Sequence, residues 1–345
     1  MERARCNPVS WQATAELKPR YYRAGGGEKE AAEKLAEAAR ILNELGGSNT
    51  IHYKTAFIIN PQAGKGRSLR VWRRLEAVLK AEAQPYSVFY TRFQGDGSNI
   101  AEQMRAKGIE LVVGVGGDGT LLEIINGLDL KNNIFGIIPA GTGNGFRRSL
   151  KIPGNPRKAL AGLSKWEPRQ VDLGIINGYY FLNVVGFGFD AAVAKLATVD
   201  NRVMRGYPAY VIAFLAKLAN FESFPITITC GSDTIREEKT FMAVISNGRY
   251  YGGQLCIAPQ ARLDDGRLDL CLLQKTGYLQ TTTLAVKVFF RQHLNHKSMY
   301  IAQYADLFVD TAASVPVHID GEIMGSLPAK IGISPRALSV LAPPA

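Results

Sequence analysis

Apolar and polar residues follow one another along residues 55–145 in a pattern that predicts strands and helices in turn. Short apolar runs such as 55–59 and 111–115 have the length of buried strands, whereas 69–81 has its apolar residues on one face of a helix. Regular strand–helix alternation is typical of a parallel sheet with helices on both faces. The predicted strands are 55–59, 87–90, 111–115 and 134–138, and the predicted helices cover 69–81 and 100–107 and begin at 121 and about 145.

The pattern changes near residue 169, where short β-rich runs replace the alternation. Two of these runs flank Asn177-Gly178, and this dipeptide between β-rich runs is the strongest short signal for a hairpin. The sequence therefore predicts an α/β N-terminal domain with a doubly wound, mostly parallel sheet, followed by a mainly antiparallel β-sandwich domain. The later strands are expected at 226–230, 241–246, 267–273, 306–309 and 315–319, with helices near 208–220 and 279–291.

These changes of pattern also predict the domain boundaries. Residues 51–168 are expected to form the α/β domain and residues 169–324 the β-sandwich, while about 325–345 return to complete the first domain. Residues 1–50 are an extension, expected to be partly disordered with one helix over Glu28–Leu45.

Composition narrows the class of protein. Hydrophobic residues make up 46% of the chain, as in globular proteins with a sizeable core. The longest apolar stretch, Tyr207–Phe221, is interrupted by Lys217 and is too short to span a bilayer. Residues 1–40 are too polar for a secretory signal, and the cysteines form no closely spaced pair, so we expect a cytoplasmic protein with reduced thiols. The cysteines are Cys6, Cys230, Cys256 and Cys271.

Three polar turns follow the predicted parallel strands. The turn 116–120 contains three glycines, which allow close approach of the backbone to a ligand, and it opens a helix whose N-terminus favours an anion. Its carboxylate and hydroxyl suit a nucleotide phosphate with Mg²⁺ nearby. A second glycine turn covers 139–145, and Asn60 begins a third that only partly resembles a P-loop. Because such strand ends share one edge of a sheet, the turns predict a phosphate cradle.

A dinucleotide site is an alternative for the same turn. Gly114, Gly116 and Gly119 satisfy the G-x-G-x-x-G pattern between a strand and a helix. That site also needs an acidic residue after the next strand to hold the ribose, and the turn 139–145 contains none. The pattern therefore favours a phosphate cradle over a dinucleotide site.

The motifs together resemble the diacylglycerol kinase catalytic-domain family of lipid kinases, which includes sphingoid-base kinases. The resemblance covers about residues 54–342 and both predicted domains. It is carried, in the family's order, by NPQAGKG, GGDGTLLEIINGL, IPAGTGN, VDLG, SNGRYYGGQLCIAPQARLDDGRLDL and HIDGE. NAD kinases share the GGDGT turn, but the start at Asn60 and the later β-domain motifs argue against that class.

The resemblance implies an ATP-dependent phosphotransferase of phospholipid biosynthesis, with ATP between the two domains and the lipid substrate in the β-sandwich. It makes Asp320 the general base on the lipid hydroxyl, with support from Glu322, and it assigns catalytic Mg²⁺ to Asp118 and Asp172 through water. It assigns a structural Mg²⁺ to Asp265 with the carbonyls of Arg262 and Arg267. It places the nucleotide at Asn60, Thr91, Gly116, Gly117, Asp118, Gly119, Thr120, Gly141, Thr142, Gly143 and Asn144.

One position departs from the family pattern. Bacterial diacylglycerol kinases usually have aspartate after the G-T-x-N turn, where this chain has Gly145. The sphingoid-base kinases often have a small residue there. The departure leaves three alternatives open: a diacylglycerol kinase, a sphingoid-base kinase, and a non-catalytic relative that binds nucleotide or lipid.

The formal net charge of +11 suggests the partners. A kinase of membrane lipids without a span must visit the bilayer, and basic residues attract it to an anionic leaflet. Tyr207–Phe221 is a candidate membrane contact, although such a helix more commonly covers a core. No zinc finger or RNA-binding motif suggests nucleic acid. The patterns leave the oligomeric state open, with a homodimer among the options.

Overall fold

A computed structural model describes residues 51–195, 221–251, 255–277, 280–281, 283–284, 287 and 292–344. The predicted helix over Glu28–Leu45 and nearly all of the candidate membrane contact Tyr207–Phe221 lie outside the described residues, as does part of the predicted helix 279–291. Within the described part, no helix is long and apolar enough to cross a membrane.

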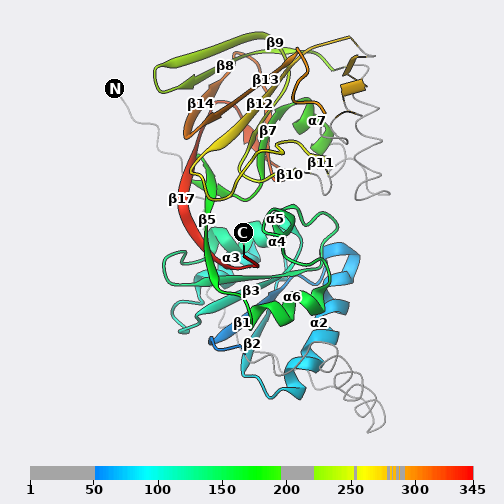
Figure 1. The fold of residues 1–345 in the computed structure, drawn as a ribbon, viewed down its shortest axis with the longest axis vertical. Coiled ribbons are helices and arrows are strands. Elements are labelled where there is room, and N and C mark those ends of the chain that lie inside the picture. Colours follow the sequence, from blue (N-terminus) through cyan, green and yellow to red (C-terminus); the bar gives the residue numbers. More distant parts are fainter. Residues whose placement is uncertain are drawn as a thin grey trace.

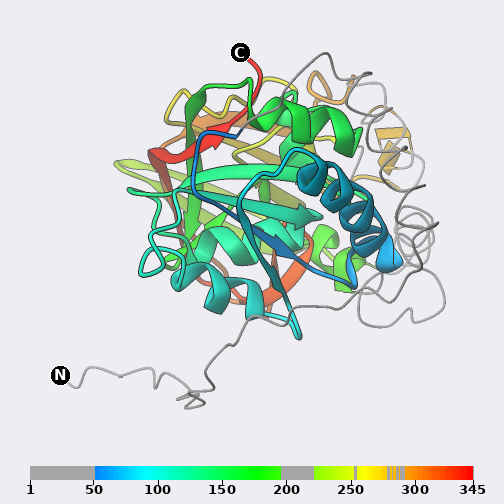
Figure 2. The same cartoon turned by 90° about the horizontal axis from the view of Figure 1, so that it is seen from below.

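The α/β half is built on four parallel strands in the order β4-β3-β1-β2. Their side chains are mostly buried, because helices cover both faces. Helices α2 and α6 pack together on one face, and α3 and α4 pack together on the other (Figure 2). The elements are β1 (Thr55–Ile59), α2 (Ala63–Ala81), β2 (Tyr86–Tyr90), α3 (Asp96–Glu102), β3 (Leu111–Gly116), α4 (Asp118–Gly127), β4 (Ile134–Pro139), α5 (Gly145–Ser149) and α6 (Pro156–Leu163).

The second half is mainly antiparallel, and Figure 1 shows it stacked on the α/β half. Its strands follow the order β16-β15-β7-β9-β8-β14, with β12 between β9 and β13 and a separate pair β10–β11. These elements are β7 (Val184–Gly188), α7 (Phe189–Lys195), β8 (Phe224–Cys230), β9 (Asp233–Ser246), β10 (Tyr250–Tyr251), β11 (Leu255–Cys256), β12 (Leu268–Gln274), β13 (Met299–Tyr304), β14 (Asp306–Asp310), β15 (Pro316–Ile319) and β16 (Glu322–Ser326).

Two long antiparallel strands, β5 (Pro168–Ile176) and β17 (Ala329–Leu341), join the halves as one ribbon (Figure 1). β17 pairs with β14 in the second half and, in parallel, with β4 in the first. Its register against β5 shifts between Ser334 and Leu338. One apolar core is continuous through both halves. The predicted fold class, a parallel α/β sheet followed by antiparallel β structure, is confirmed.

Local predictions were accurate where the turn chemistry was unambiguous. Asn177 and Gly178 have φ of 48° and 87°, and they connect β5 to β6 (Tyr179–Phe181) in the predicted hairpin. The helix predicted over 100–107 is wrong in its limits, because left-handed Gly95 starts α3 at Asp96 and the chain leaves the helix after Glu102. α6 was not predicted, although Asn155 caps it and proline occupies its first turn. The three described cysteines are buried and form no disulfide with one another.

Candidate functional site

The structure brings the three predicted turns together at one edge of the parallel sheet. Asn60 donates from Nδ2 to Oγ1 of Thr120 at 3.1 Å, which joins the end of β1 to the start of α4. The backbone N–H of Gly141 donates to the carbonyl of Gly116 at 3.0 Å, which joins the ends of β4 and β3. Thr91 follows β2 and donates its N–H to Ile59 at 2.9 Å, so it belongs to the same edge.

The two glycine turns touch through their backbones. A Cβ atom added to Gly141 would lie 2.3 Å from Cα of Gly117, so neither turn has room for a side chain at this point. Asn144 holds the second turn closed, because its amide group both donates to the carbonyl of Gly141 at 2.8 Å and accepts its N–H at 3.2 Å. Thr142 at the tip is exposed and Gly143 is partly exposed. The contact makes a compact backbone surface of the kind that approaches phosphates closely.

The third turn adds a run of left-handed backbone. Gly64, Lys65 and Gly66 have φ of 59°, 57° and 77°, at the start of α2. A Cβ atom on Gly64 would lie 2.4 Å from the carbonyl oxygen of Ala140, so this turn packs against the second glycine turn. Gly66 has only a carbonyl oxygen at 4.0 Å from such an atom. The two glycines are therefore needed for different reasons.

Asp118 links the first glycine turn to the second. Its carboxylate accepts the N–H of Gly145 at 2.8 Å and that of Phe146 at 3.1 Å, at the start of α5. Burial raises the pKa of Asp118, and the two backbone hydrogen bonds oppose that shift. A Cβ atom on Gly145 would lie 3.0 Å from the carbonyl oxygen of Tyr250, so the position at which the family resemblance leads us to expect aspartate is tight in this chain.

Asp320 lies in the turn between β15 and β16, where both central residues have positive φ. Its carboxylate accepts three backbone N–H groups from the start of β7, at 2.8, 2.9 and 3.0 Å. Burial raises the pKa of Asp320 to about 6, and the charge of Asp118 acts in the same direction. The two carboxylates are therefore close enough for their charges to interact. The three donors are Leu182, Asn183 and Val184.

Glu322 belongs to the second half, and its side chain contacts the glycine turn of the first half. One of its oxygens would lie 2.7 Å from a Cβ atom on Gly119, so β16 rests on the glycine turn before α4. The other accepts from Nε2 of Gln94 at 3.3 Å. Burial and the charge of Glu123 raise the pKa of Glu322. Gln94, Glu123 and the amide donors of Asp320 were not predicted, since no motif marks a partner distant in sequence or a backbone N–H.

The hydrogen bonds that the structure describes connect Asp172 to the turn next to Asp265, and not to Asp118. The carboxylate of Asp172 accepts the N–H of Gly266 and that of Arg336, both at 2.7 Å. The charge of Asp172 contributes to the raised pKa of Asp265, although burial is the larger cause. The geometry thus gives Asp172 a structural role at the junction, and its assignment to a catalytic Mg²⁺ stays a prediction.

The turn around Asp265 has the donors that a hard cation uses. Asp265 accepts the N–H of Arg267 at 3.1 Å, and the neighbouring Asp172 adds a second carboxylate. Carboxylate and carbonyl oxygens are the ligands that Mg²⁺ prefers. The described residues contain no group of three or more histidine, cysteine, aspartate or glutamate side chains that could hold a metal ion. Any ion here would rely on carbonyls, including that of Arg262, and on water.

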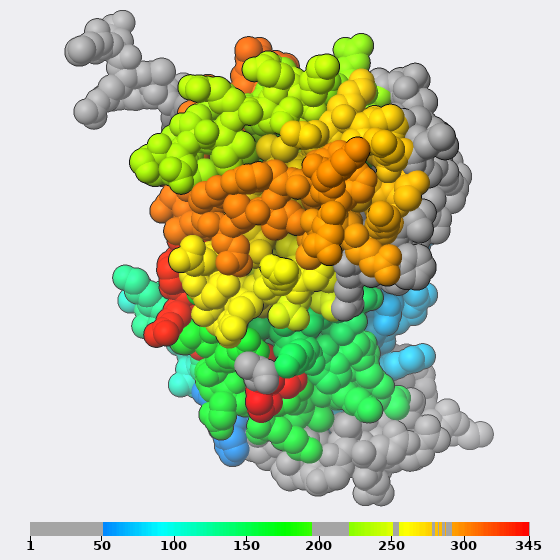
Figure 3. All heavy atoms as spheres, turned by 45° about the horizontal axis from the view of Figure 1, so that its top comes forward, coloured from blue at the N-terminus to red at the C-terminus, as the bar shows by residue number. Residues whose placement is uncertain are grey.

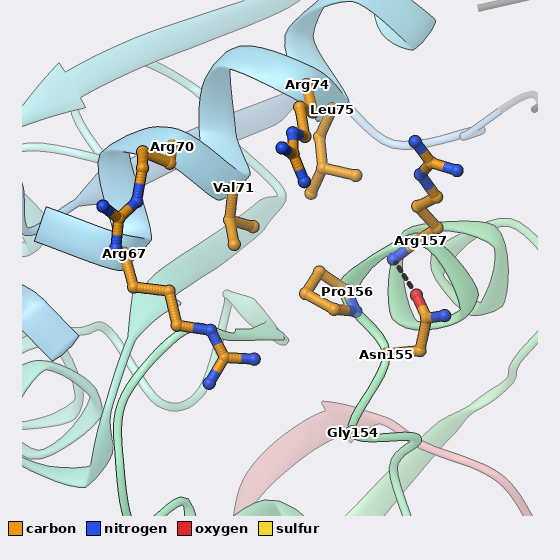
Figure 4. Close-up of a pocket in the computed structure, with 9 residues that line it drawn as sticks. All are labelled: Arg67, Arg70, Val71, Arg74, Leu75, Gly154, Asn155, Pro156 and Arg157. Atoms are coloured by element: carbon orange, nitrogen blue, oxygen red, sulfur yellow. Dashed lines mark hydrogen bonds between the residues drawn. The ribbon is translucent and has the colours of Figure 1, made fainter. Parts of the chain in front are cut away.

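A basic groove lies beside the site, between α2 and α6 (Figure 4). We define the arginine groove as the cavity of about 520 Å³ between these helices. Figure 4 shows side chains of both helices around one open space, and none of the described residues that line it is acidic. Its first arginine follows directly on the left-handed turn 64–66, so the groove begins next to that turn. The arginines are Arg67, Arg70, Arg74 and Arg157.

Comparison with known proteins agrees with this geometry. The diacylglycerol kinase catalytic domain matches residues 54–176, and the YegS C-terminal NAD kinase beta sandwich-like domain matches residues 183–342. The chain is 32% identical to "Probable lipid kinase YegS-like" of Pseudomonas aeruginosa, covering 79% of this chain and 89% of that one. It is 27% identical to a diacylglycerol kinase of Bacillus subtilis, covering 84% and 96%. A crystal structure of a Bacillus anthracis diacylglycerol kinase has the same fold, with a TM-score of 0.64, 24% identity and coverage of 85% and 98%.

The two halves and the acidic junction between them define a phosphotransferase that acts on an alcohol group. The chain belongs to the diacylglycerol kinase catalytic-domain family, and it is a lipid kinase.

Proposed function

We propose that this kinase transfers the γ-phosphate of ATP, with Mg²⁺, to the hydroxyl of diacylglycerol or a related lipid. The observation that carries the proposal is the carboxylate of Asp320. It is held by three backbone N–H groups at the junction of the halves, and its pKa is raised to about 6. A carboxylate with this pKa is ionised at neutral pH and is a stronger base than an exposed aspartate.

The proposed reaction needs little covalent chemistry from the protein. Asp320 takes the proton of the lipid hydroxyl, the hydroxyl oxygen forms a bond to the γ-phosphorus, and the bond from that phosphorus to the ADP oxygen breaks. Glu322 lies against the glycine turn and holds β16 there, so it positions the base relative to the nucleotide. The remaining catalysis comes from orientation and charge neutralisation.

The nucleotide is proposed to lie along the edge formed by the three turns. The backbone contact between Gly117 and Gly141, the left-handed run 64–66 and the N-terminus of α4 all support phosphate binding there. Mg²⁺, when bound, would neutralise phosphate charge. Asp118 fits the catalytic ion by position, and Asp265 with Asp172 fits a structural one.

A lipid panel with one variant tests this function. We would measure transfer of radiolabelled phosphate from ATP, with and without Mg²⁺, to diacylglycerol, monoacylglycerol, a sphingoid base, ceramide and a polyprenol in mixed micelles. Wild type should phosphorylate one of these classes, and Asp320→Asn should lower kcat by roughly 100-fold or more, because the base is lost. Asp310→Asn, which changes an exposed aspartate on β14, should have no effect.

Two outcomes would contradict the proposal. Full activity of Asp320→Asn would show that Asp320 is not the base. Binding of ATP without transfer to any lipid would favour the non-catalytic relative, with Gly145 as the lost arm of the Mg²⁺ network. The identity of the phosphorylated lipid would decide between a diacylglycerol kinase and a sphingoid-base kinase.

We also propose that this is a cytoplasmic enzyme that binds anionic membranes peripherally through the arginine groove. The groove collects guanidinium groups from two helices, and the part of its lining that the structure describes contains no acidic residue. It adjoins the phosphate cradle, so binding there would bring the site to the bilayer surface. The net charge of +11 favours the encounter, at about 1 kcal/mol for each well-placed basic residue.

Vesicle binding tests this surface with a neighbouring control. Arg70→Glu with Arg74→Glu should weaken binding to phosphatidylglycerol-containing vesicles at least about tenfold, and binding should fall as salt rises. Arg73→Glu is the control, because Arg73 is equally exposed on α2 but does not line the groove. An equal loss of vesicle binding in the double variant and in Arg73→Glu would mean that general charge, and not the groove, attracts the membrane.

A further inference from the structure

Two buried side chains lie behind the turn that carries Asp320. His318 on β15 is fully buried, and its Nε2 lies 2.6 Å from Oδ2 of Asp190 on α7. Its other ring nitrogen, Nδ1, accepts the N–H of Gly321 at 3.2 Å. The three residues form a hydrogen-bonded chain from α7 through β15 to the turn, which we call the Asp190–His318–Gly321 relay.

The direction of the relay follows from its last member. A backbone N–H can only donate, so Nδ1 of His318 is the acceptor and the ring hydrogen lies on Nε2. Nε2 therefore donates to the carboxylate of Asp190. A ring held at both nitrogens has one tautomer and one orientation, so Gly321 meets an acceptor at a fixed place.

The relay occupies space that a glycine leaves open. Gly186 on β7 pairs with His318 across the sheet. A Cβ atom on Gly186 would lie 2.2 Å both from Oδ2 of Asp190 and from Nε2 of His318. Burying a carboxylate and an imidazole is costly compared with an apolar pair of the same size. Two apolar side chains could fill this volume, so packing alone does not require the pair.

The turn that the relay holds is a tight two-residue hairpin with left-handed backbone. Asp320 has φ of 50° and Gly321 has φ of 96°. An Asp-Gly pair adopts this conformation readily, and hydrogen bonds on two sides hold the turn in place. The three N–H donors at 182–184 fix one side of the turn, and His318 fixes the other through Gly321.

We propose that Asp190 and His318 are positioning residues for Asp320. They hold the N–H of Gly321, and through it the turn, so that the carboxylate of Asp320 stays under its amide donors and faces the junction. The inference rests on the proposed role of Asp320 as the base, and it adds the residues that keep that base in place.

Kinetics in two backgrounds test the positioning role. His318→Leu removes both hydrogen bonds, and we expect kcat to fall at least about tenfold while KM for ATP changes less than about twofold. His318→Gln keeps one donor and one acceptor, so it should recover part of the lost kcat. Asp190→Asn should show the same partial loss of kcat as His318→Gln. In the Asp320→Asn background, His318→Leu should cost no further activity, because the positioned group is already absent.

The chain offers a matched control for destabilisation. His293 is also fully buried, and its Nε2 lies 2.8 Å from the carbonyl oxygen of Ile257, away from the turn. His293→Gln should lower thermal stability without changing kcat of the folded protein. Equal kcat losses in His318→Leu and His318→Gln, or a further loss in the Asp320→Asn background, would overturn the proposal in favour of a packing role.

Hydrogen exchange gives a readout that needs no activity. The amides of Leu182, Asn183 and Val184 should exchange at least about tenfold faster in His318→Leu and Asp190→Leu than in wild type or His293→Gln, because their acceptor is released. Unchanged exchange would refute the relay. If wild type phosphorylates no lipid while exchange responds as expected, the proposed function fails but the relay stands.

Discussion

Asp320 is subject to opposing effects on its pKa. Three backbone N–H groups stabilise the charged carboxylate and lower the pKa, while burial and the nearby charge of Asp118 raise it. Burial is the largest cause, and the pKa lies at about 6. The result is a base that is ionised at neutral pH and holds a proton more tightly than an exposed aspartate does.

The pH dependence of catalysis follows from this pKa. The folded-state pKa is raised, so protonation on acidification removes the base earlier than for an ordinary aspartate. We expect kcat/KM to be constant at neutral pH and to fall as pH drops through about 6, by about tenfold for each further pH unit, because kcat/KM reports the pKa of the free enzyme. The profile is measured at limiting ATP and lipid, after a check that the protein stays folded. A constant kcat/KM down to pH of about 4.5 would contradict the assignment.

The sequence identified Asp320 but not its environment. The Asp-Gly pair is a hairpin signal, and the HIDGE motif carried the resemblance, so both the turn and the residue could be predicted. The amide donors at 182–184 could not be predicted. Every residue except proline has a backbone N–H, and no side-chain pattern shows where that N–H points. His318 stands in the same motif, yet its partner Asp190 lies 128 residues away in sequence.

At the scale of elements, the phosphate cradle depends on how closely its turns pack. The glycines in the sequence predicted a close approach of the backbone to a ligand. The positions of the turns after parallel strands predicted the edge of the sheet on which these glycines lie. Which glycine supplies conformational freedom and which supplies space is visible only in the structure, where Gly64 meets Ala140 and Gly66 meets almost nothing.

A pair of glycine variants separates these two effects. Gly64→Ala and Gly66→Ala both place alanine at positive φ, at a cost of about 1 kcal/mol each. Only Gly64→Ala also drives a methyl group into the carbonyl of Ala140, so it should raise KM for ATP roughly tenfold more than Gly66→Ala does. Nucleotide titration and kinetics measure the difference. Equal effects would show that the contact between the turns does not shape the cradle.

At the scale of the whole molecule, Asp172 ties the joining ribbon to the second half. It lies on β5, and its carboxylate accepts N–H groups from the irregular stretch of β17 and from the turn at Gly266. The sequence placed Asp172 in a motif and suggested a metal ligand. It could not show that Arg336, 164 residues away, would present its backbone to this side chain.

Loss of the two hydrogen bonds to Asp172 should lower the stability of the protein. Asp172→Ala leaves two partly buried N–H groups without their acceptor, so the free energy of unfolding should fall by about 2 kcal/mol in urea titrations. Asp264→Ala is the control in the adjoining turn, because its ion pairs with Arg169 and Arg262 lie at the surface and should cost about 1 kcal/mol or less. A small effect of Asp172→Ala on stability with a large fall in kcat would instead support a catalytic metal role.

The place of β17 in the sheet also matters while the chain is being made. β17 lies between β14 and β4 and pairs with β5, yet it leaves the ribosome after all three. Until it arrives, those strands present unpaired N–H and C=O groups, which are templates for association with other chains. The nascent protein is therefore two unfinished sheets for most of its synthesis, and its greatest exposure to aggregation, and need for chaperones, lasts until residue 341 has emerged.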